Sequence, residues 1–338
     1  MAERGARVIA EETFWLRIPP PVRSGLLLAL LFGFAALLGL ADSNGTKASD
    51  QFTGSVPWTV WRGIASAALV TFLVLGVQAT RVLQHPGRWG IEAAPSRRRR
   101  YLLSAAMGAI ALAAYRLISP ATGPDLPVQN LSLRTTTVLI GGMLASVPWL
   151  TVVWLAHAEC RDLGKAVTRR PQAPIDEYAA ALQDEPGETV HFRRAVERLL
   201  QLWQLLLVCV GAFTVGVVAA VATSGALRGA FVAAHPDRSD EFPPANVLLY
   251  GAFFALALSI ITLPLAASWR ARAQELVEHG CPLPADGRPT AEWAEDRARL
   301  ETLLHLDLSI LRNPLTALSV LAPLLISALA AFLPQIAG

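Results

Sequence analysis

Seven continuous apolar stretches, separated by polar segments, set the pattern of this 338-residue chain. They cover residues 24–41, 63–80, 101–119, 135–158, 199–227, 242–269 and 313–338. Each has about the 20 residues that an α-helix needs to cross a hydrocarbon core of about 30 Å. Hydrocarbon offers no partner to an unpaired amide, and barrel strands would alternate between apolar and polar residues. The pattern therefore predicts an all-α integral membrane protein with seven transmembrane helices.

The third stretch departs from this pattern, because Arg116 interrupts it and only residues 101–115 are free of charge. An arginine so close to the end of a span can extend its side chain to the lipid headgroups. The first stretch has a rival interpretation, since Gly39-Leu40-Ala41 fits a signal-peptidase site. Its apolar run is longer than the usual signal-peptide core, which favours an uncleaved anchor. Cleavage would leave six spans in the same orientation.

The distribution of Lys and Arg predicts the orientation. Residues 1–23, 81–100, 159–198 and 270–312 together hold 23 of the 29 Lys and Arg residues of the chain. Segments rich in these residues stay on the cytoplasmic side. We therefore expect the N-terminus in the cytoplasm and, after seven crossings of the inner (plasma) membrane, the C-terminus outside. Residues 1–23 are a cytoplasmic segment with room for an interfacial helix.

Composition supports a membrane protein and adds a hint of its source. Hydrophobic residues make up 53% of the chain and charged residues 16%, against about 25% charged in soluble proteins. Only two of the basic residues are lysines, and with the richness in Ala, Leu, Gly and Pro this indicates a GC-rich bacterial genome. The net charge of +3 comes from arginine-rich inner loops, which predicts contact with an anionic inner leaflet and no nucleic acid. Arg97, Arg98, Arg99 and Arg100 are expected to stop and anchor the third span at the membrane surface, and a specific site for lipid headgroups or nucleic acid is the alternative.

Aromatic and basic residues near the span ends predict interfacial anchors. Tryptophan and tyrosine prefer the membrane–water interface, so we expect an aromatic belt from Trp58, Trp61, Tyr101, Trp154, Tyr250 and Trp269. At the outer ends, Arg62, Arg116, Arg134 and Arg228 are expected as snorkelling anchors and exposed ion pairs. A vestibule that attracts anions is the alternative for these four arginines.

The two long connections, residues 159–198 and 270–312, share a layout and are predicted to be cytoplasmic helical loops. Each has Pro- and Gly-containing breaks and then restarts as an amphipathic helix leading into the next span. Thr290 fits the N-cap of the second restart, which is expected to continue from Ala291 for about 40 residues with a kink at Pro314. The apolar face of these restarts consists of Trp293, Leu300, Leu304, Leu308 and Leu311, with Phe192 and Val196 before the fifth span.

Two interpretations of this apolar face remain open. The extensions pack on each other within one chain, or they form a surface that binds a protein partner or a second copy. The last four spans are thus expected to form two hairpins that open toward the cytoplasm. The first three spans are expected to be plain membrane anchors.

Residues with catalytic potential are scarce. The middle of every predicted span lacks Asp, Glu, Lys, Arg and His, and the hydroxyl groups there are expected to bond to their own helix backbone. No catalytic, phosphate-binding or cofactor motif is present. The spacing of His157, Glu159, Cys160, His279 and Cys281 does not match a closed zinc site, so we expect neither a metal nor a cofactor. The three cysteines suggest no disulfide framework.

Three classes of function are compatible with this pattern. The sequence favours a non-enzymatic membrane protein whose cytoplasmic extensions serve a signalling, effector or assembly role. The alternative is a passive or oligomeric channel or transporter, because charge-free spans do not suit an active one. A membrane enzyme would need convergent polar residues that the sequence lacks.

Overall fold

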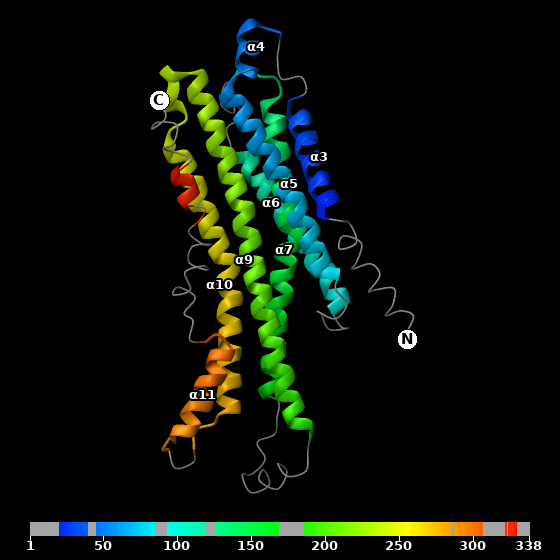
Figure 1. Ribbon diagram of the computed structural model, residues 1–338, viewed down its shortest axis with the longest axis vertical. Helices are drawn as coiled ribbons and strands as arrows, with labels where there is room; N and C mark the ends of the chain where they lie inside the picture. Colours follow the sequence, from blue (N-terminus) through cyan, green and yellow to red (C-terminus); the bar gives the residue numbers. More distant parts are fainter. Residues whose placement is uncertain are drawn as a thin grey trace, which may run out of the picture.

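The chain folds into an elongated bundle of helices (Figure 1). The computed structural model describes residues 20–39, 45–84, 93–118, 126–168, 186–284, 287–306, 322 and 324–329. Within these ranges all regular secondary structure is helical. Two short helices mark the ends of the bundle, and we call these the α4 end and the α11 end.

The main helices run nearly along the long axis of the bundle (Figure 1). In chain order the helical elements are α3 (Pro20–Gly39), α4 (Lys47–Thr53), α5 (Val56–Gln84), α6 (Ala93–Ile118), α7 (Leu131–Thr168), α9 (Pro186–Ala234), η1 (Pro236–Glu241), α10 (Pro244–Gly280) and α11 (Ala291–Leu303).

Four helical segments are long and apolar enough to cross a membrane. They are Val56–Gln84, Leu131–Leu163, Phe192–Ala234 and Pro236–Gly280. These segments contain the predicted spans 63–80, 135–158, 199–227 and 242–269. The first and third predicted spans correspond to α3 and α6, which are not among these four segments; Gly25–Gly39 of α3 is a shorter apolar helix. The span 313–338 lies mostly outside the described residues, although residues 324–329 are helical. Seven crossings thus stay a prediction.

Two large buried clusters form most of the core, one toward each end of the bundle, and a small third cluster contains Val221 of α9 and Val247 of α10. The first, at the α4 end, includes Trp58, Trp61 and Phe231. The second, at the α11 end, includes Trp149, Trp203 and Trp269. Helices α5, α7 and α9 contribute to both clusters, so the bundle is continuous from one end to the other.

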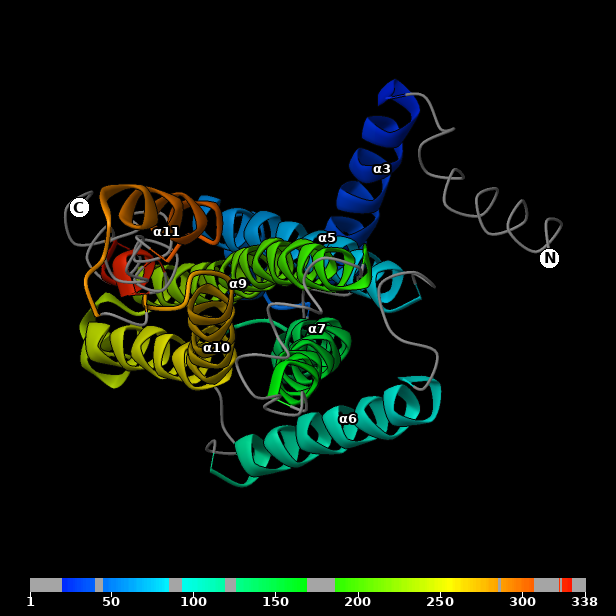
Figure 2. The same ribbon diagram turned by 90° about the horizontal axis from the view of Figure 1, so that it is seen from below.

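Helix α5 is a central element of this bundle. It packs against α3, α7 and α9 (Figure 2). The helices approach closely where glycines leave space: Gly141 and Gly142 of α7 lie against Leu69 and Phe72 of α5. The expectation that the second span is a plain anchor is therefore wrong.

The predicted aromatic belt is also partly wrong. Trp58, Trp61 and Trp269 are at most 3% exposed and belong to the two core clusters. A tryptophan near a span end fits a protein core as well as a membrane interface, because removing its large apolar ring from water is favourable in both places. Tyr101 is exposed, in agreement with the belt.

Helix α11 begins as expected but ends early. The Thr290 hydroxyl accepts a hydrogen bond from the Trp293 amide at 3.2 Å, which confirms the predicted N-cap. The helix stops at Leu303, and His305 adopts a φ of 54°. The amide of Leu306 then donates to the Glu301 carbonyl at 2.9 Å, and that of His305 to Thr302 at 3.0 Å, the pattern of a Schellman cap. The predicted helix of about 40 residues from Ala291 is therefore wrong, and Pro314 lies outside the described residues.

Helix α6 lies at the edge of the bundle, with α7 between it and the other long helices (Figure 2). Its contacts with α7 use small residues: the Thr151 hydroxyl donates to that of Ser104 at 3.1 Å, and Gly108 lies against Val147. Outward-facing Leu102, Leu103 and Ile110 are 46–69% exposed. Such a surface suits a lipid environment.

Candidate functional site

The α11 end is the candidate functional region. Most of the charged residues described in the predicted cytoplasmic loops lie there. Its centre is a tryptophan pair, Trp203 of α9 and Trp269 of α10, with ring centroids 4.5 Å apart. The indole N–H of Trp269 donates to the Leu199 carbonyl at 2.8 Å. Residue 199 begins the fifth apolar stretch, so this bond joins α10 to α9 at the level where the charged part of α9 ends.

Helix α11 is attached to this centre by its C-terminal cap. Leu304 and Leu306 are buried in the same cluster, and the His305 ring lies 5.8 Å from that of Trp203. A guanidinium N–H of Arg270 also donates to the Leu306 carbonyl at 3.3 Å. The residues that end α11 are therefore the residues that fix it to α9 and α10.

The predicted partner surface faces largely inward. Phe192, Val196 and Leu300 pack against the buried cluster that contains Leu304. A methyl group on Gly280 would lie 2.6 Å from the Phe192 ring and 3.3 Å from Leu300, so the two restarts meet at this glycine. In the described part of the chain these apolar side chains serve internal packing, the first of the two interpretations.

The remaining residues of that predicted surface divide into two groups. The Trp293 indole N–H donates to the Pro282 carbonyl at 2.9 Å, and the Arg297 guanidinium lies 5.4 Å from the Trp293 ring centroid. Trp293 thus holds the turn before α11. Leu308 and Leu311 lie outside the described residues.

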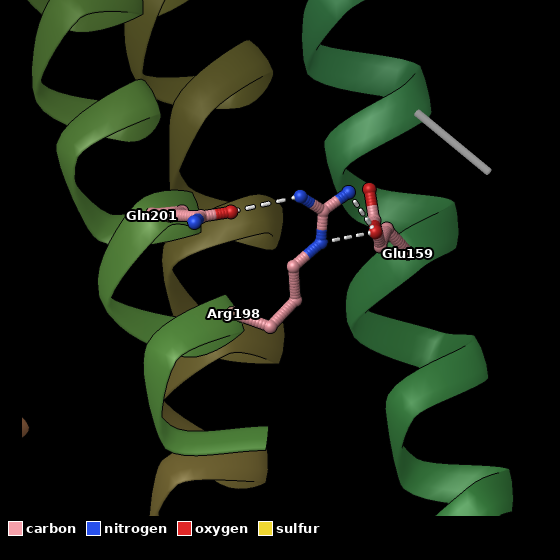
Figure 3. A network of polar contacts seen from close by, with 3 residues as sticks. All are labelled: Glu159, Arg198 and Gln201. Atoms are coloured by element: carbon pink, nitrogen blue, oxygen red, sulfur yellow. Dashed lines mark hydrogen bonds and ion pairs between the residues drawn. The ribbon is translucent and has the colours of Figure 1, made fainter. Parts of the chain in front are cut away.

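A polar contact joins α7 to α9 at the same end of the bundle (Figure 3). The Nε of Arg198 donates to Oε1 of Glu159 at 2.5 Å, and Nη1 of Arg198 donates to the Gln201 side-chain oxygen at 2.9 Å. The Arg198 and Glu159 side chains are 19% and 21% exposed. A pair this sheltered is screened less by salt than a surface pair, and it fixes the two helices at one register.

Other polar residues here have local partners. Arg272 forms an ion pair with Glu275 on α10, and Nδ1 of His157 lies 3.2 Å from the Ser268 hydroxyl. Cys160 and Cys209 are buried, while Cys281 is half-buried. Among the residues with described positions, no group of three or more His, Cys, Asp and Glu side chains could hold a metal ion.

The arginine run Arg97–Arg100 has mixed surroundings. Nη1 of Arg100 donates to the Trp154 carbonyl of α7 at 2.5 Å. Burial, followed by the nearby Arg161, lowers the pKa of the Arg100 guanidinium. Arg98 and Arg99 are exposed, and the side chain of Arg97 is outside the described part. Arg100 therefore attaches α6 to α7, and the two exposed arginines are available to the surroundings.

The arginines at the α4 end are more buried than expected. Arg228 is 2% exposed and Arg134 is 6% exposed, so neither is a surface anchor and that expectation is wrong for both. Nε of Arg228 donates to the Phe242 carbonyl at 3.0 Å, and Nη2 of Arg62 donates to the Ala35 carbonyl at 3.1 Å. The Arg134 guanidinium lies 5.9 Å from the Trp58 ring centroid. The Arg116 side chain lies outside the described residues.

A helical register could have revealed the position of Arg228. It shares a face of α9 with the buried residues Val221 and Gly225, at spacings of seven and three. The position of Arg228 near the end of the span favours a surface anchor, whereas its face of the helix favours burial. The hydroxyl prediction is confirmed at most of the sites described: Ser66, Thr71, Thr214, Ser259 and Thr262 each donate to the carbonyl four residues earlier.

Comparison with known proteins found no relative of this chain. No protein-family model, no curated protein and no solved structure matches the chain.

Proposed function

We propose that this chain is a non-enzymatic, multi-pass protein of a bacterial inner membrane with a signalling, effector or assembly role. In this proposal the N-terminus and the α11 end lie in the cytoplasm, and the C-terminus lies outside. The concentration of Lys and Arg in residues 81–100, 159–198 and 270–312 supports the orientation. The protein acts by binding a protein partner or a second copy through its cytoplasmic helices.

The observation that carries this proposal is the continuity of α9. Its 49 residues correspond to about 70 Å, whereas a whole bilayer with its headgroups is about 40–45 Å thick. The helix packs in the cluster of Trp58 and Phe231 and in that of Trp203. A helix packed along most of its length moves as one body, so a displacement on one side of the membrane is transmitted to the other.

The surface proposed for a partner is the part of α11 that internal packing leaves exposed. Phe192, Val196 and Leu304 are occupied inside the bundle, so a partner contacts the outward face of α11. That face is acidic: Glu292, Glu295 and Asp296 are exposed. Two of them lie near Arg299, at 3.7 Å and 3.6 Å, and exposed pairs of this kind contribute little to stability. These acids can therefore exchange Arg299 for a basic partner with little loss of stability.

Site-specific photocrosslinking in intact cells tests the proposal. A photoreactive residue replaces Ala298 on α11, and the same residue replaces Gln129, which is exposed near the α4 end, as the matched control. We expect a discrete crosslinked species, a partner or a dimer, from position 298 and none from position 129. Equal or absent crosslinking at both positions, with a single copy in several mild detergents, would contradict the proposal. Single-channel currents in planar bilayers would favour the channel alternative.

The orientation has its own test, because Cys281 is the most accessible of the three cysteines. A membrane-impermeant maleimide is expected to label the protein only after the cells are permeabilised, and Cys281→Ser abolishes that labelling. In the Cys281→Ser background, Gln129→Cys is expected to be labelled in intact cells. Labelling of Cys281 from outside would overturn the orientation.

A further inference from the structure

Exposed basic residues of α6 and α7 lie at neighbouring levels along the bundle axis. The contacts Gly108–Val147, Ser104–Thr151 and Arg100–Trp154 show that the two helices are antiparallel neighbours, since residue numbers rise on one as they fall on the other. Continuing this register toward the α11 end brings residues 97–99 of α6 beside the stretch of α7 that leads to Arg161. Arg98, Arg99 and Arg161 are exposed and lie within about two helical turns, or roughly 10 Å, along the bundle axis.

An apolar surface begins directly next to these charges. On α6 the residues that follow the arginines are exposed: Leu102 at 59%, Leu103 at 46% and Met107 at 49%. A cationic band followed along the helix by an apolar band has the layout of a phospholipid, whose phosphate lies at the interface and whose acyl chains lie in the core.

We infer that Arg98, Arg99 and Arg161 bind the phosphate of an anionic phospholipid of the inner leaflet, with the acyl chains against Leu102, Leu103 and Met107. Guanidinium groups suit this ligand because their N–H groups match phosphate oxygens in pairs. The acids described on this stretch of α7 leave the site cationic, since Glu159 is bound to Arg198 and Asp162 stands against three arginines. The inference rests on the proposed membrane insertion and not on partner binding.

The bound lipid would hold α6 to the bundle. Arg100 is already committed to the Trp154 carbonyl, and the hydroxyl contact of Ser104 and Thr151 is the next polar link along the interface. A phosphate bound by these arginines would reduce the repulsion between like charges on the two helices.

Lipid retention by the full-length protein tests this inference. The protein is purified in mild detergent, supplied with phosphatidylglycerol or with phosphatidylcholine, and analysed by native mass spectrometry. We expect preferential retention of phosphatidylglycerol by the wild type. Each arginine near a membrane surface contributes about fivefold in affinity, so R98Q/R99Q/R161Q is expected to weaken retention by up to about 100-fold at low salt.

The control removes the same charge elsewhere. R193Q/R297Q/R299Q changes three arginines of the α11 end that pair with Glu197, Glu301 and Glu295, and it should retain phosphatidylglycerol as the wild type does. Equal retention by wild type and R98Q/R99Q/R161Q, or equal loss in both variants, would overturn the site. Displacement of the lipid by millimolar inorganic phosphate at constant ionic strength would instead identify a soluble phosphate as the ligand and overturn the lipid assignment. The crosslinking result at position 298 is independent of each outcome.

Discussion

Three sheltered arginines at the α4 end have partners of a different kind from those of three arginines at the α11 end. At the α11 end, Arg198, Arg272 and Arg297 each contact a carboxylate. At the α4 end, Arg228 and Arg62 donate to backbone carbonyls and Arg134 lies over a tryptophan. Both ends nevertheless contain a stacked or tilted tryptophan pair, with centroids 4.6 Å and 4.5 Å apart. The aromatic cores are thus similar, and the polar partners differ.

The difference shows two ways to stabilise a guanidinium away from water. A carboxylate brings a second charge that must also be desolvated, whereas a carbonyl dipole or an aromatic face does not. Arg228, Arg62 and Arg134 use the second solution, and Arg198, Arg272 and Arg297 use the first. The division is not complete, because the exposed Arg238 at the α4 end pairs with Glu241 and Arg270 at the α11 end donates to the Leu306 carbonyl. Three experiments, each with its control, sharpen this comparison.

The largest effect is expected at the aromatic core of the α11 end. Trp269→Ala removes a ring that is 3% exposed and should lower the free energy of unfolding by about 3–5 kcal/mol. Trp269→Phe keeps most of the volume and removes the hydrogen bond to the Leu199 carbonyl, so about 1–2 kcal/mol is expected. Thermal unfolding of the purified protein in mild detergent measures both. Equal, small losses would show that the tryptophan pair does not hold the α11 end together.

The next effect is expected at the buried arginine of the α4 end. Arg228→Met removes the charged donor to the Phe242 carbonyl and should cost about 1.5–3 kcal/mol in unfolding free energy. Arg238→Met is the control, because Arg238 pairs with Glu241 on the surface and contributes less than about 1 kcal/mol. If both variants unfolded at the same temperature, the carbonyl contact would not be stabilising.

The smallest effect separates the two kinds of ion pair at the α11 end. A double-mutant cycle of Arg198→Gln and Glu159→Gln is expected to give a coupling energy of about 1–2 kcal/mol, between the values for exposed and buried pairs. The same cycle for Arg193 and Glu197, which are 82% and 54% exposed, should give less than about 0.5 kcal/mol. Raising the salt concentration should reduce the second coupling more than the first. A larger coupling in the exposed pair would contradict this view of shielding.

The sequence predicted the features that depend on local pattern. Four apolar stretches long enough to cross a membrane, the Thr290 cap and the backbone bonds of the span hydroxyls all follow from residues close together in the chain. Such features need no knowledge of how helices pack.

What the sequence could not predict depends on contacts between distant residues. Trp58 and Trp269 are compatible with both a membrane interface and a core, and only the positions of α7 and α9 decide between them. The early end of α11 was missed because its left-handed residue is His305, where glycine is the usual signal. A capping residue of this kind is stabilised by tertiary contacts, here with Trp203, which the local sequence does not contain.

The continuity of α9 also constrains how this protein can change in length. Each residue inserted into a helix turns everything beyond it by about 100°. Since α9 contributes to both core clusters, one residue added between Ala212 and Leu227 would rotate the faces of Trp203 and Phe231 out of phase. An insertion of seven residues restores the phase to within about 20°. The two ends of the molecule therefore share a single helical register, and evolution can lengthen this helix only in steps that preserve it.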